Sequence, residues 1–402
     1  MDQKVRFQGL RSYKKRSLLF VNEHFYSKRN AEDRHYGQTL VISEEIIVRI
    51  PETVPEGRFG LPGRSRIFGT IVIAARKYGI SSTIFISKII MDYYIGIEIG
   101  GSKFQAVLGD VKNHIVERYR FTVDMKKGAK GIQEEIQLAI SRFNKYNPLA
   151  VGIGFGGPVD FEKGIICKSH QIDGWNNFPL RTWIEKISGL PSKVDNDANV
   201  AGLAETFHGN GKNVKNVFYV CIGSGMGGGL IINNQIFHGE KPGEAEIGQM
   251  PADRNGKNME SLCCGWAADR KIKAYTKRNP ASPLAKLTRG MNGGEAKFLI
   301  NALDQGDKGA EKILTEMADN ISYALSYAVH LFHPKRIIIG GGLSLTGDPL
   351  FSRINSILPG YTVKAFLPAP EVKMALLGED VVCIGALILA QQALQEKKGK
   401  RK

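Results

Sequence analysis

The residues most suited to chemistry in this chain stand together in the segment Val194-Asp195-Asn196-Asp197-Ala198-Asn199. The segment lies between a short apolar strand pattern and a helix that we expect to begin near Val200. Asp or Asn at such a junction is most often a helix N-cap. One of the two carboxylates could instead be a general base that accepts the proton of a hydroxyl group.

Three glycine-rich turns each follow an apolar strand pattern, at Gly100-Gly101, at 223–229 and at 340–342. Glycines in any single turn could serve tight hairpin geometry alone. Backbone N–H groups of such turns can also reach phosphate oxygens, because no side chain intervenes. None of the turns carries the Gly-Lys-Ser/Thr of a P-loop, and 223–225 leads into a strand rather than the helix of a dinucleotide site. Together with a general base, they indicate phosphoryl transfer.

The elements that must position these residues follow a repeated pattern. We expect strands at 93–98, 104–109, 114–123 and 149–155, and a helix at 131–146. The strand, glycine turn and strand pattern returns about 125 residues later, at 218–222 and 230–232. A further strand is expected at 336–339, with helices at 260–275, 308–332 and 381–396. This repetition predicts a duplicated, two-lobed mixed α/β fold.

The composition and the charge distribution of the chain limit which class of protein it can be. The chain has 402 residues, of which 43% are hydrophobic and 23% charged, which are the values of a globular protein. The net charge of +16 is concentrated at the two ends: residues 1–91 contain 16 Lys and Arg against 8 Asp and Glu, and residues 391–402 contain 5 against 1. The first ninety residues show neither sustained strand or helix periodicity nor a helix-turn-helix pattern, so we do not expect nucleic-acid binding.

We divide the chain into a basic N-terminal extension, residues 1–90, and two lobes, residues 91–205 and 206–402. We expect the extension to be poorly ordered or not native, with Met91 as an alternative start. No apolar window is long enough for a membrane span, since charged residues interrupt the best one, 71–90. Five cysteines without an export signal indicate a cytoplasmic protein with reduced thiols.

The motifs resemble those of the ROK family, bacterial sugar kinases and sugar-responsive repressors with a two-lobed actin-like ATPase (ribonuclease H-like) fold and a cleft between the lobes. The resemblance covers about residues 92–392 and rests on six segments, in the family's order: 96–103 (GIEIGGSK), 152–160 (GIGFGGPVD), 196–199 (NDAN), 223–229 (GSGMGGG), 246–248 (EIG) and 340–342 (GGG).

The resemblance implies a glucokinase-like enzyme that uses ATP and Mg²⁺, with Asp197 as the general base toward the sugar. It implies that the sugar is bound by Gly156, Gly157, Asn196, Asp197, Glu246, Gln249 and Glu260. It implies that the phosphates, the adenosine and the Mg²⁺ side are bound by Glu98, Gly100, Gly101, Ser102, Lys103, Gly223, Ser224, Gly225, Gly227, Gly340, Gly341 and Gly342. A homodimer is also typical of the family.

Two departures from the family pattern bear on function. Glu98 stands where most members have Asp, which keeps the charge but lengthens its reach by one methylene group. Gln249 replaces the histidine of zinc-binding members, and the stretch from Ala252 to Met259 has no cysteine, so we expect no bound zinc. The other histidines, His238 among them, show no metal or nucleophile spacing. Trp175 fits a core position better than a sugar-stacking one.

Three functions stay open from the sequence. The first is an ATP-dependent sugar kinase that phosphorylates a hexose. The second is a sugar-sensing regulator without kinase activity, for which the sequence offers no recognition helix. The third is a kinase that takes its phosphate from polyphosphate. The sequence favours the first, because the expected base would otherwise be an unpaired buried carboxylate.

Overall fold

The structure is a computed structural model that describes residues 68–75, 80–87, 92–101, 103–169, 172–241 and 243–399. The chain divides into two compact units, Met1–Met91 and Asp92–Lys402. In the first unit, β1 (Phe68–Ala75) pairs antiparallel with β2 (Ile80–Ser87). These residues show no sustained strand periodicity in the sequence, but they are rich in the β-branched types that favour strands. The rest of the expected extension lies outside the described residues.

The second unit contains two five-stranded sheets with the same strand order. The first sheet has the order β5-β4-β3-β6-β9, with strands Ile115–Thr122, Lys103–Gly109, Tyr94–Ile99, Val151–Phe155 and Ser192–Asn196. The second has the order β12-β11-β10-β13-β14, with strands Gln235–Ile236, Met226–Ile232, Asn216–Ile222, Arg336–Gly340 and Glu371–Met374. The shared order confirms the duplicated, actin-like α/β fold.

Hydrogen bonding is also equivalent in the two sheets. β3 pairs antiparallel with β4 and parallel with β6, and β10 pairs antiparallel with β11 and parallel with β13. β6 is in turn parallel to β9. Parallel strands end at the same edge of a sheet, so the turns after β3, β6 and β9 must lie together, as must those after β10 and β13.

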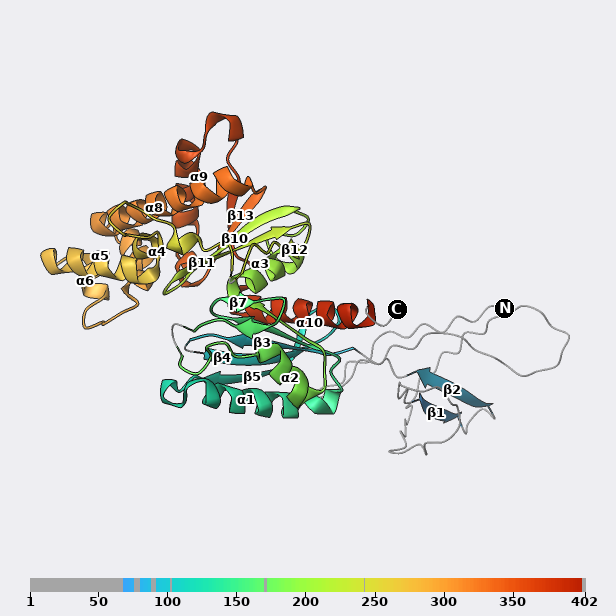
Figure 1. Ribbon diagram of the computed structural model, residues 1–402. Coiled ribbons are helices and arrows are strands. Elements are labelled where there is room, and N and C mark those ends of the chain that lie inside the picture. Colours follow the sequence, from blue (N-terminus) through green and yellow to red (C-terminus); the bar gives the residue numbers. More distant parts are fainter. Residues whose placement is uncertain are drawn as a thin grey trace. The chain divides into compact units, whose positions relative to one another are not determined.

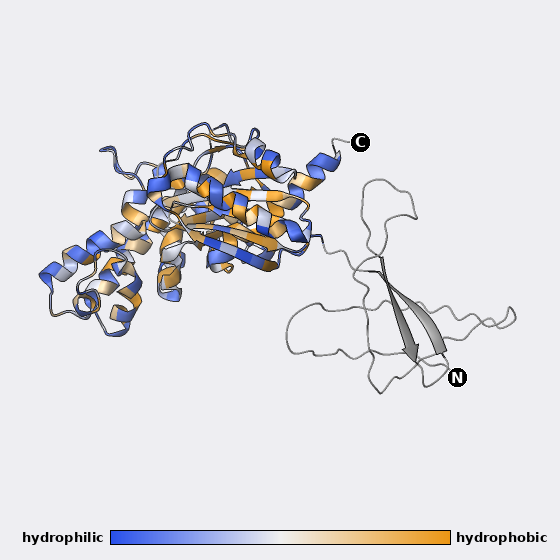
Figure 2. Cartoon of the chain, turned by 90° about the horizontal axis from the view of Figure 1, so that it is seen from below, coloured by the Kyte–Doolittle hydropathy of each residue, from blue (hydrophilic) through white to orange (hydrophobic). Residues whose placement is uncertain are grey.

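Helices cover both faces of the first sheet (Figure 1). α1 (Gly128–Phe143) and α2 (Leu180–Ser188) contact one face, whereas α10 (Val381–Gly399) packs on β3, β6 and β9. α10 also packs on α3 (Asp197–His208), where a Cβ added at Gly385 would lie 2.0 Å from the Val200 carbonyl oxygen. The end of the chain therefore returns to the first sheet. Figure 2 shows apolar residues concentrated in the strands and in the adjoining helix faces.

The remaining helices belong to the second lobe. They are α4 (Glu260–Cys263), α5 (Gly265–Arg278), α6 (Pro283–Leu287), α7 (Leu299–Asp304), α8 (Lys308–Phe332) and α9 (Asp348–Tyr361). The bounds of α8 confirm the prediction. The single helix expected at 260–275 was wrong, because Cys264 is extended (φ −72°, ψ 167°) and separates α4 from α5. No described helix is long and apolar enough to cross a membrane.

A buried carboxylate joins the two segments that connect the lobes. Glu205, near the end of α3, is 0% exposed. One of its oxygens accepts hydrogen bonds from the backbone of Leu376 and Leu377 at 2.8 and 2.9 Å, and the other accepts from the backbone of Asn210 at 2.9 Å. Burial raises the pKa of Glu205, and these three backbone bonds oppose that rise. The link after α3 and the link before α10 are thereby held together.

The hydrophobic core of the first lobe contains Trp175, which is 0% exposed. Its ring meets Phe155 edge to face with the centroids 5.9 Å apart. This confirms Trp175 as a core residue, so its ring has no open face on which a sugar could stack.

Candidate active site

The ends of β3, β6 and β9 bring the first set of expected site residues together. Gly156, after β6, donates a backbone hydrogen bond to Ile99 of β3 at 2.9 Å. A Cβ added at Gly156 would lie 3.3 Å from Asp197 Oδ2 and 3.7 Å from the Cα of Gly100. The first glycine turn, the second strand end and the expected base therefore meet at one point. Of the neighbouring expected residues, Ser102 lies outside the described residues, and only the backbone of Lys103 is described.

The junction between β9 and α3 positions the expected base. Asn196 is the N-cap of α3: its Oδ1 accepts from the backbone of Ala198 at 2.9 Å, and its Nδ2 donates to the Gly157 carbonyl at 3.1 Å. Asp197 is the first residue of the helix. The N-cap role is thus taken by Asn196, and the Asp197 side chain can face the glycine turns.

The electrostatics around Asp197 are those of a proton acceptor. Its pKa is raised from 3.8 to about 7, chiefly by burial and also by the carboxylates of Glu98 and Glu246, against opposing backbone hydrogen bonds. Three carboxyl groups from β3, α3 and the segment before η3 (Ile247–Gln249) therefore act on one another. A carboxyl group with a pKa near neutrality can both accept a proton and release it again at the same pH.

The second and third glycine turns also meet. Gly341, after β13, has φ +83°, and a Cβ added there would lie 2.5 Å from the Ile222 carbonyl at the end of β10. Gly223 and Gly342 have no heavy atom within 4 Å of an added Cβ, so both open onto free space. Exposed glycine backbone of this kind can hydrogen-bond phosphate oxygens, and the nucleotide roles of these turns stay predictions. The carboxylate of Glu98 is a ligand type that Mg²⁺ accepts.

The other expected sugar residues lie on the second lobe. Glu260, the first residue of α4, accepts a hydrogen bond from the backbone of Met226 at 2.8 Å, so one of its oxygens holds the second glycine turn. Gln249 Oε1 accepts from Asn258 Nδ2 at 3.1 Å, and the Gln249 side chain is exposed. The sugar roles of these two residues stay predictions.

A network around Glu98 was not apparent from the sequence. Gln105 of β4 is 1% exposed and donates from Nε2 to Glu98. Its Oε1 accepts from Arg118 at 2.8 Å and from Arg120 at 3.1 Å. Because two cationic donors face the amide oxygen, the amide nitrogen must face the carboxylate. Arg118 in turn pairs with Asp380 at 2.7 Å, just before α10.

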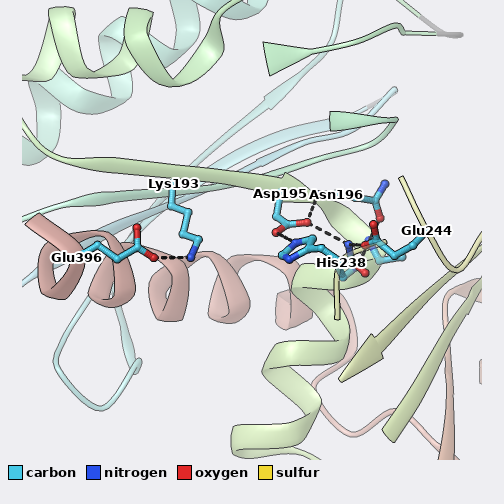
Figure 3. A network of polar contacts seen from close by, with 8 residues as sticks. Lys193, Asp195, Asn196, His238, Glu244 and Glu396 are labelled. Carbon is cyan, nitrogen blue, oxygen red and sulfur yellow. Dashed lines mark hydrogen bonds and ion pairs between the residues drawn. The ribbon is translucent and has the colours of Figure 1, made fainter. Parts of the chain in front are cut away.

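A second polar network, which was not predicted from the sequence, surrounds Asp195 at the junction between β9 and α3 (Figure 3). Asp195 is 2% exposed, and its Oδ2 accepts from His238 Nε2 at 2.7 Å. Asn199 Nδ2 donates to Asp195 Oδ1 at 3.0 Å and also to Glu244. Burial raises the pKa of Glu244. These side chains border a pocket between the lobes, lined by Pro158, Val159, Phe161, Asp195, Asn196, Asn199, His238, Gly243, Glu244 and Glu246.

The cysteines next to Glu260 are buried. Cys263 is 0% exposed and Cys264 4%, and burial raises the pKa of Cys263 to about 12. In the part of the chain that the structure describes, no group of three or more His, Cys, Asp or Glu could hold a metal ion. The expectation of no bound zinc stays a prediction.

Comparison with known proteins assigns the second unit. The ROK family model matches residues 94–393. The glucokinase of Streptomyces coelicolor is 31% identical over 320 residues, which cover 75% of this chain and 98% of that protein. The glucokinase of Halalkalibacterium halodurans is 28% identical over 323 residues, covering 76% and 97%.

Solved structures agree with this assignment. The ROK glucokinase of Streptomyces griseus, in complex with glucose and AMPPNP, superposes with a TM-score of 0.66 at 30% identity, covering 75% of this chain and 99% of that one. A ROK family transcriptional regulator superposes with a TM-score of 0.67 at 19% identity, covering 80% and 83%, which shows the shared fold. On the family match and these relatives, the chain belongs to the ROK family.

Proposed function

We propose that this chain is an ATP-dependent hexose kinase in which Asp197 is the general base. The chain is a sugar kinase on the evidence of its glucokinase relatives, which match it over nearly their full length. One observation carries the assignment of the base: the Asp197 carboxyl, with a pKa of about 7, lies 3.3 Å from a Cβ position at Gly156 where two glycine turns meet.

The described side chains suggest how the transfer proceeds. A sugar hydroxyl that approaches Asp197 gives its proton to the carboxylate as the oxygen attacks the γ-phosphorus and the bond to the nucleotide breaks. Asn196, fixed by the Gly157 carbonyl and by α3, and Glu246 orient the sugar. Glu98 would help to hold Mg²⁺, which would supply neutralisation of charge on the phosphate oxygens. Backbone N–H groups of the glycine turns hold those oxygens.

Glucose is the substrate that the relatives favour. The curated relatives from Halalkalibacterium halodurans, Thermotoga maritima and Streptomyces coelicolor are all glucokinases, at 28%, 27% and 31% identity. Gln249, which has no imidazole to offer a sugar, is the position at which this chain could differ from them.

Direct detection of sugar phosphate tests the proposal. The purified chain is incubated with ATP and Mg²⁺ against a panel of glucose, mannose, fructose, allose and N-acetylated hexosamines, and in a second series with polyphosphate in place of ATP. We expect one hexose, with glucose first, to be phosphorylated from ATP. Transfer from polyphosphate but not from ATP would contradict ATP as the phosphate donor. Sugar binding without transfer from either donor would contradict kinase activity and favour a sugar-sensing regulator.

A further inference from the structure

The segment that carries Glu246 has little regular structure of its own. We call residues 237–241 and 243–246 the strap; it runs from β12 to η3 on the second lobe. No described residue of the strap belongs to a helix or strand, and its backbone hydrogen bonds include those at its two ends, from Phe237 to the Leu230 carbonyl and from Gln249 to the Glu246 carbonyl. Ala245, next to Glu246, has φ +55°, a conformation that residues other than glycine rarely adopt. Such a segment keeps one conformation only if its side chains are anchored to neighbouring elements.

The side-chain hydrogen bonds and ion pairs given below join the strap to the first lobe, whereas the Phe237 N–H bonds the Leu230 carbonyl of β11 at 2.8 Å and Ala245 packs on the core of the second lobe. His238 bonds Asp195 of β9 at 2.7 Å, and Glu244 accepts from Asn199 of α3. Lys241 pairs with Glu162 and lies 3.5 Å from Asp160. Lys241 and Glu162 are 32% and 62% exposed, and ion pairs in water contribute little. Of the side-chain anchors, the partly buried pairs of His238 with Asp195 and of Glu244 with Asn199 therefore contribute most to holding the strap.

His238 is the better fixed of these two. A carboxylate has no hydrogen to give, so His238 Nε2–H must donate to Asp195 Oδ2. The imidazole also stacks on the ring of Phe161, with the centroids 3.7 Å apart and the planes 10° apart. The His238 side chain is 16% exposed and that of Asp195 2%, so water competes weakly for the bond. Hydrogen bonds to a charged group in such surroundings are among the strong ones.

Asp195 links the strap to the residues that face the sugar. Its second oxygen, Oδ1, accepts from the backbone of Asn196 at 2.8 Å and from Asn199 at 3.0 Å. Asn196 keeps its own bonds to Ala198 and Gly157 without any help from His238. Loss of the His238 bond should thus loosen the strap and the placement of Glu246, although Glu244 still bonds Asn199, and leave the junction that carries Asp197 in place.

We propose that His238 is a positioning residue of the sugar site: its bond to Asp195 holds the strap so that Glu246 faces Asn196 and Asp197. The inference rests on the proposed function for the identity of the ligand. It predicts a specific kinetic signature, in which sugar affinity falls while phosphoryl transfer and nucleotide affinity are kept.

Three single variants of the full chain separate the bond from the stacking. His238→Phe keeps an aromatic ring against Phe161 but has no donor. His238→Gln keeps an amide donor at a similar reach but loses the stacking. Lys193→Met is the matched control, because Lys193 lies two residues before Asp195 on the same face of β9 and pairs with Glu396 at 2.7 Å, away from the strap (Figure 3).

Steady-state kinetics with the best hexose give the first readout. We expect His238→Phe to raise the sugar KM about tenfold or more, with kcat and the ATP KM within about twofold, as for loss of a hydrogen bond to a charged group. His238→Gln should raise the sugar KM less than His238→Phe, and Lys193→Met should match the parent protein. A sugar KM in folded His238→Phe within about twofold of the parent, or an equal rise in Lys193→Met, would overturn the proposal.

Hydrogen exchange of the ligand-free protein gives a readout that needs no turnover. We expect amides of 237–249 to exchange faster in His238→Phe than in the parent protein, while exchange in α3 and β9 is unchanged. Equal exchange rates of the strap amides in both proteins would contradict the role of His238 in holding the strap, even if no sugar of the hexose panel were phosphorylated. Absence of turnover in the parent protein would instead contradict the proposed function, so the two failures are distinguishable.

Discussion

Asp197 owes its pKa to its position among other acidic groups as well as to burial. The carboxylates of Glu98 and Glu246 both raise it, and they come from segments about 100 residues and 50 residues away in the sequence. Repulsion of this kind favours the protonated form of Asp197 unless a bound cation offsets the neighbouring charges. The site is therefore arranged so that proton uptake by Asp197 is favourable near neutral pH.

The pH dependence of the reaction follows from this pKa. Asp197 must be ionised to accept a proton, so kcat/KM should be constant well above pH 7 and fall about tenfold per pH unit below it. Glu98→Gln removes one raising charge and should move the midpoint of any remaining activity to lower pH. A pH–rate profile of the free enzyme checks both statements. A midpoint near 4, the usual value for Asp, would contradict the proposed environment of the base.

At the scale of elements, glycine at the strand ends serves two distinct purposes. Gly341 has a positive φ and lies against the Ile222 carbonyl, so glycine is required there by the fold itself. Gly342 has open space where a methyl group would stand and no positive φ, so nothing in the fold requires it. Its lack of a side chain is explained if the space is used by the nucleotide.

Gly342→Ala tests the use of that space. We expect the thermal midpoint to stay within about 1–2 °C, because the added methyl group meets no protein atom, while the ATP KM rises several-fold and the sugar KM is unchanged. Gly360→Ala in α9, which also has open space around its Cβ, is the control and should change neither constant. An unchanged ATP KM in folded Gly342→Ala would show that the adenosine lies elsewhere.

The hydrogen bonds of Glu205 predict how much the two links between the lobes contribute to stability. Glu205→Gln cannot accept all three backbone hydrogen bonds, because its amide nitrogen is a donor, so we expect a loss of about 1–3 kcal/mol in the free energy of unfolding. Glu396→Gln, in an exposed ion pair, should cost less than about 1 kcal/mol. Urea denaturation measures both. Equal stability of the two variants would mean that the three bonds do not hold the links.

Much of the element order could be predicted from the sequence, because strands, glycine turns and α8 carry local signals. The strand ends that gather Gly100, Gly156 and Asp197 follow from parallel pairing alone. The networks of Gln105 and His238 could not be predicted in this way. His238 and Asp195 are 43 residues apart on different lobes, so only the folded chain brings them together. The return of α10 to the first sheet is equally a matter of tertiary packing.

At the scale of the whole molecule, the chain divides into two compact units, Met1–Met91, in which basic residues outnumber acidic ones, and Asp92–Lys402. Every described residue of the candidate active site lies in the second unit, as does the matched family region 94–393. We therefore expect residues 92–402 to fold alone and to phosphorylate the sugar with a kcat/KM within about twofold of the full chain. Loss of folding or activity on removal of residues 1–91 would assign them a part in the enzyme.

The central claim is that Asp197 accepts the proton of the sugar hydroxyl, and Asp197→Asn tests it most directly. Asparagine keeps the shape and removes the base, so kcat should fall about 10²- to 10⁴-fold, while sugar binding measured by calorimetry stays within several-fold of the parent protein. Turnover of folded Asp197→Asn within tenfold of the parent would contradict the claim and remove Asp197 from the chemistry.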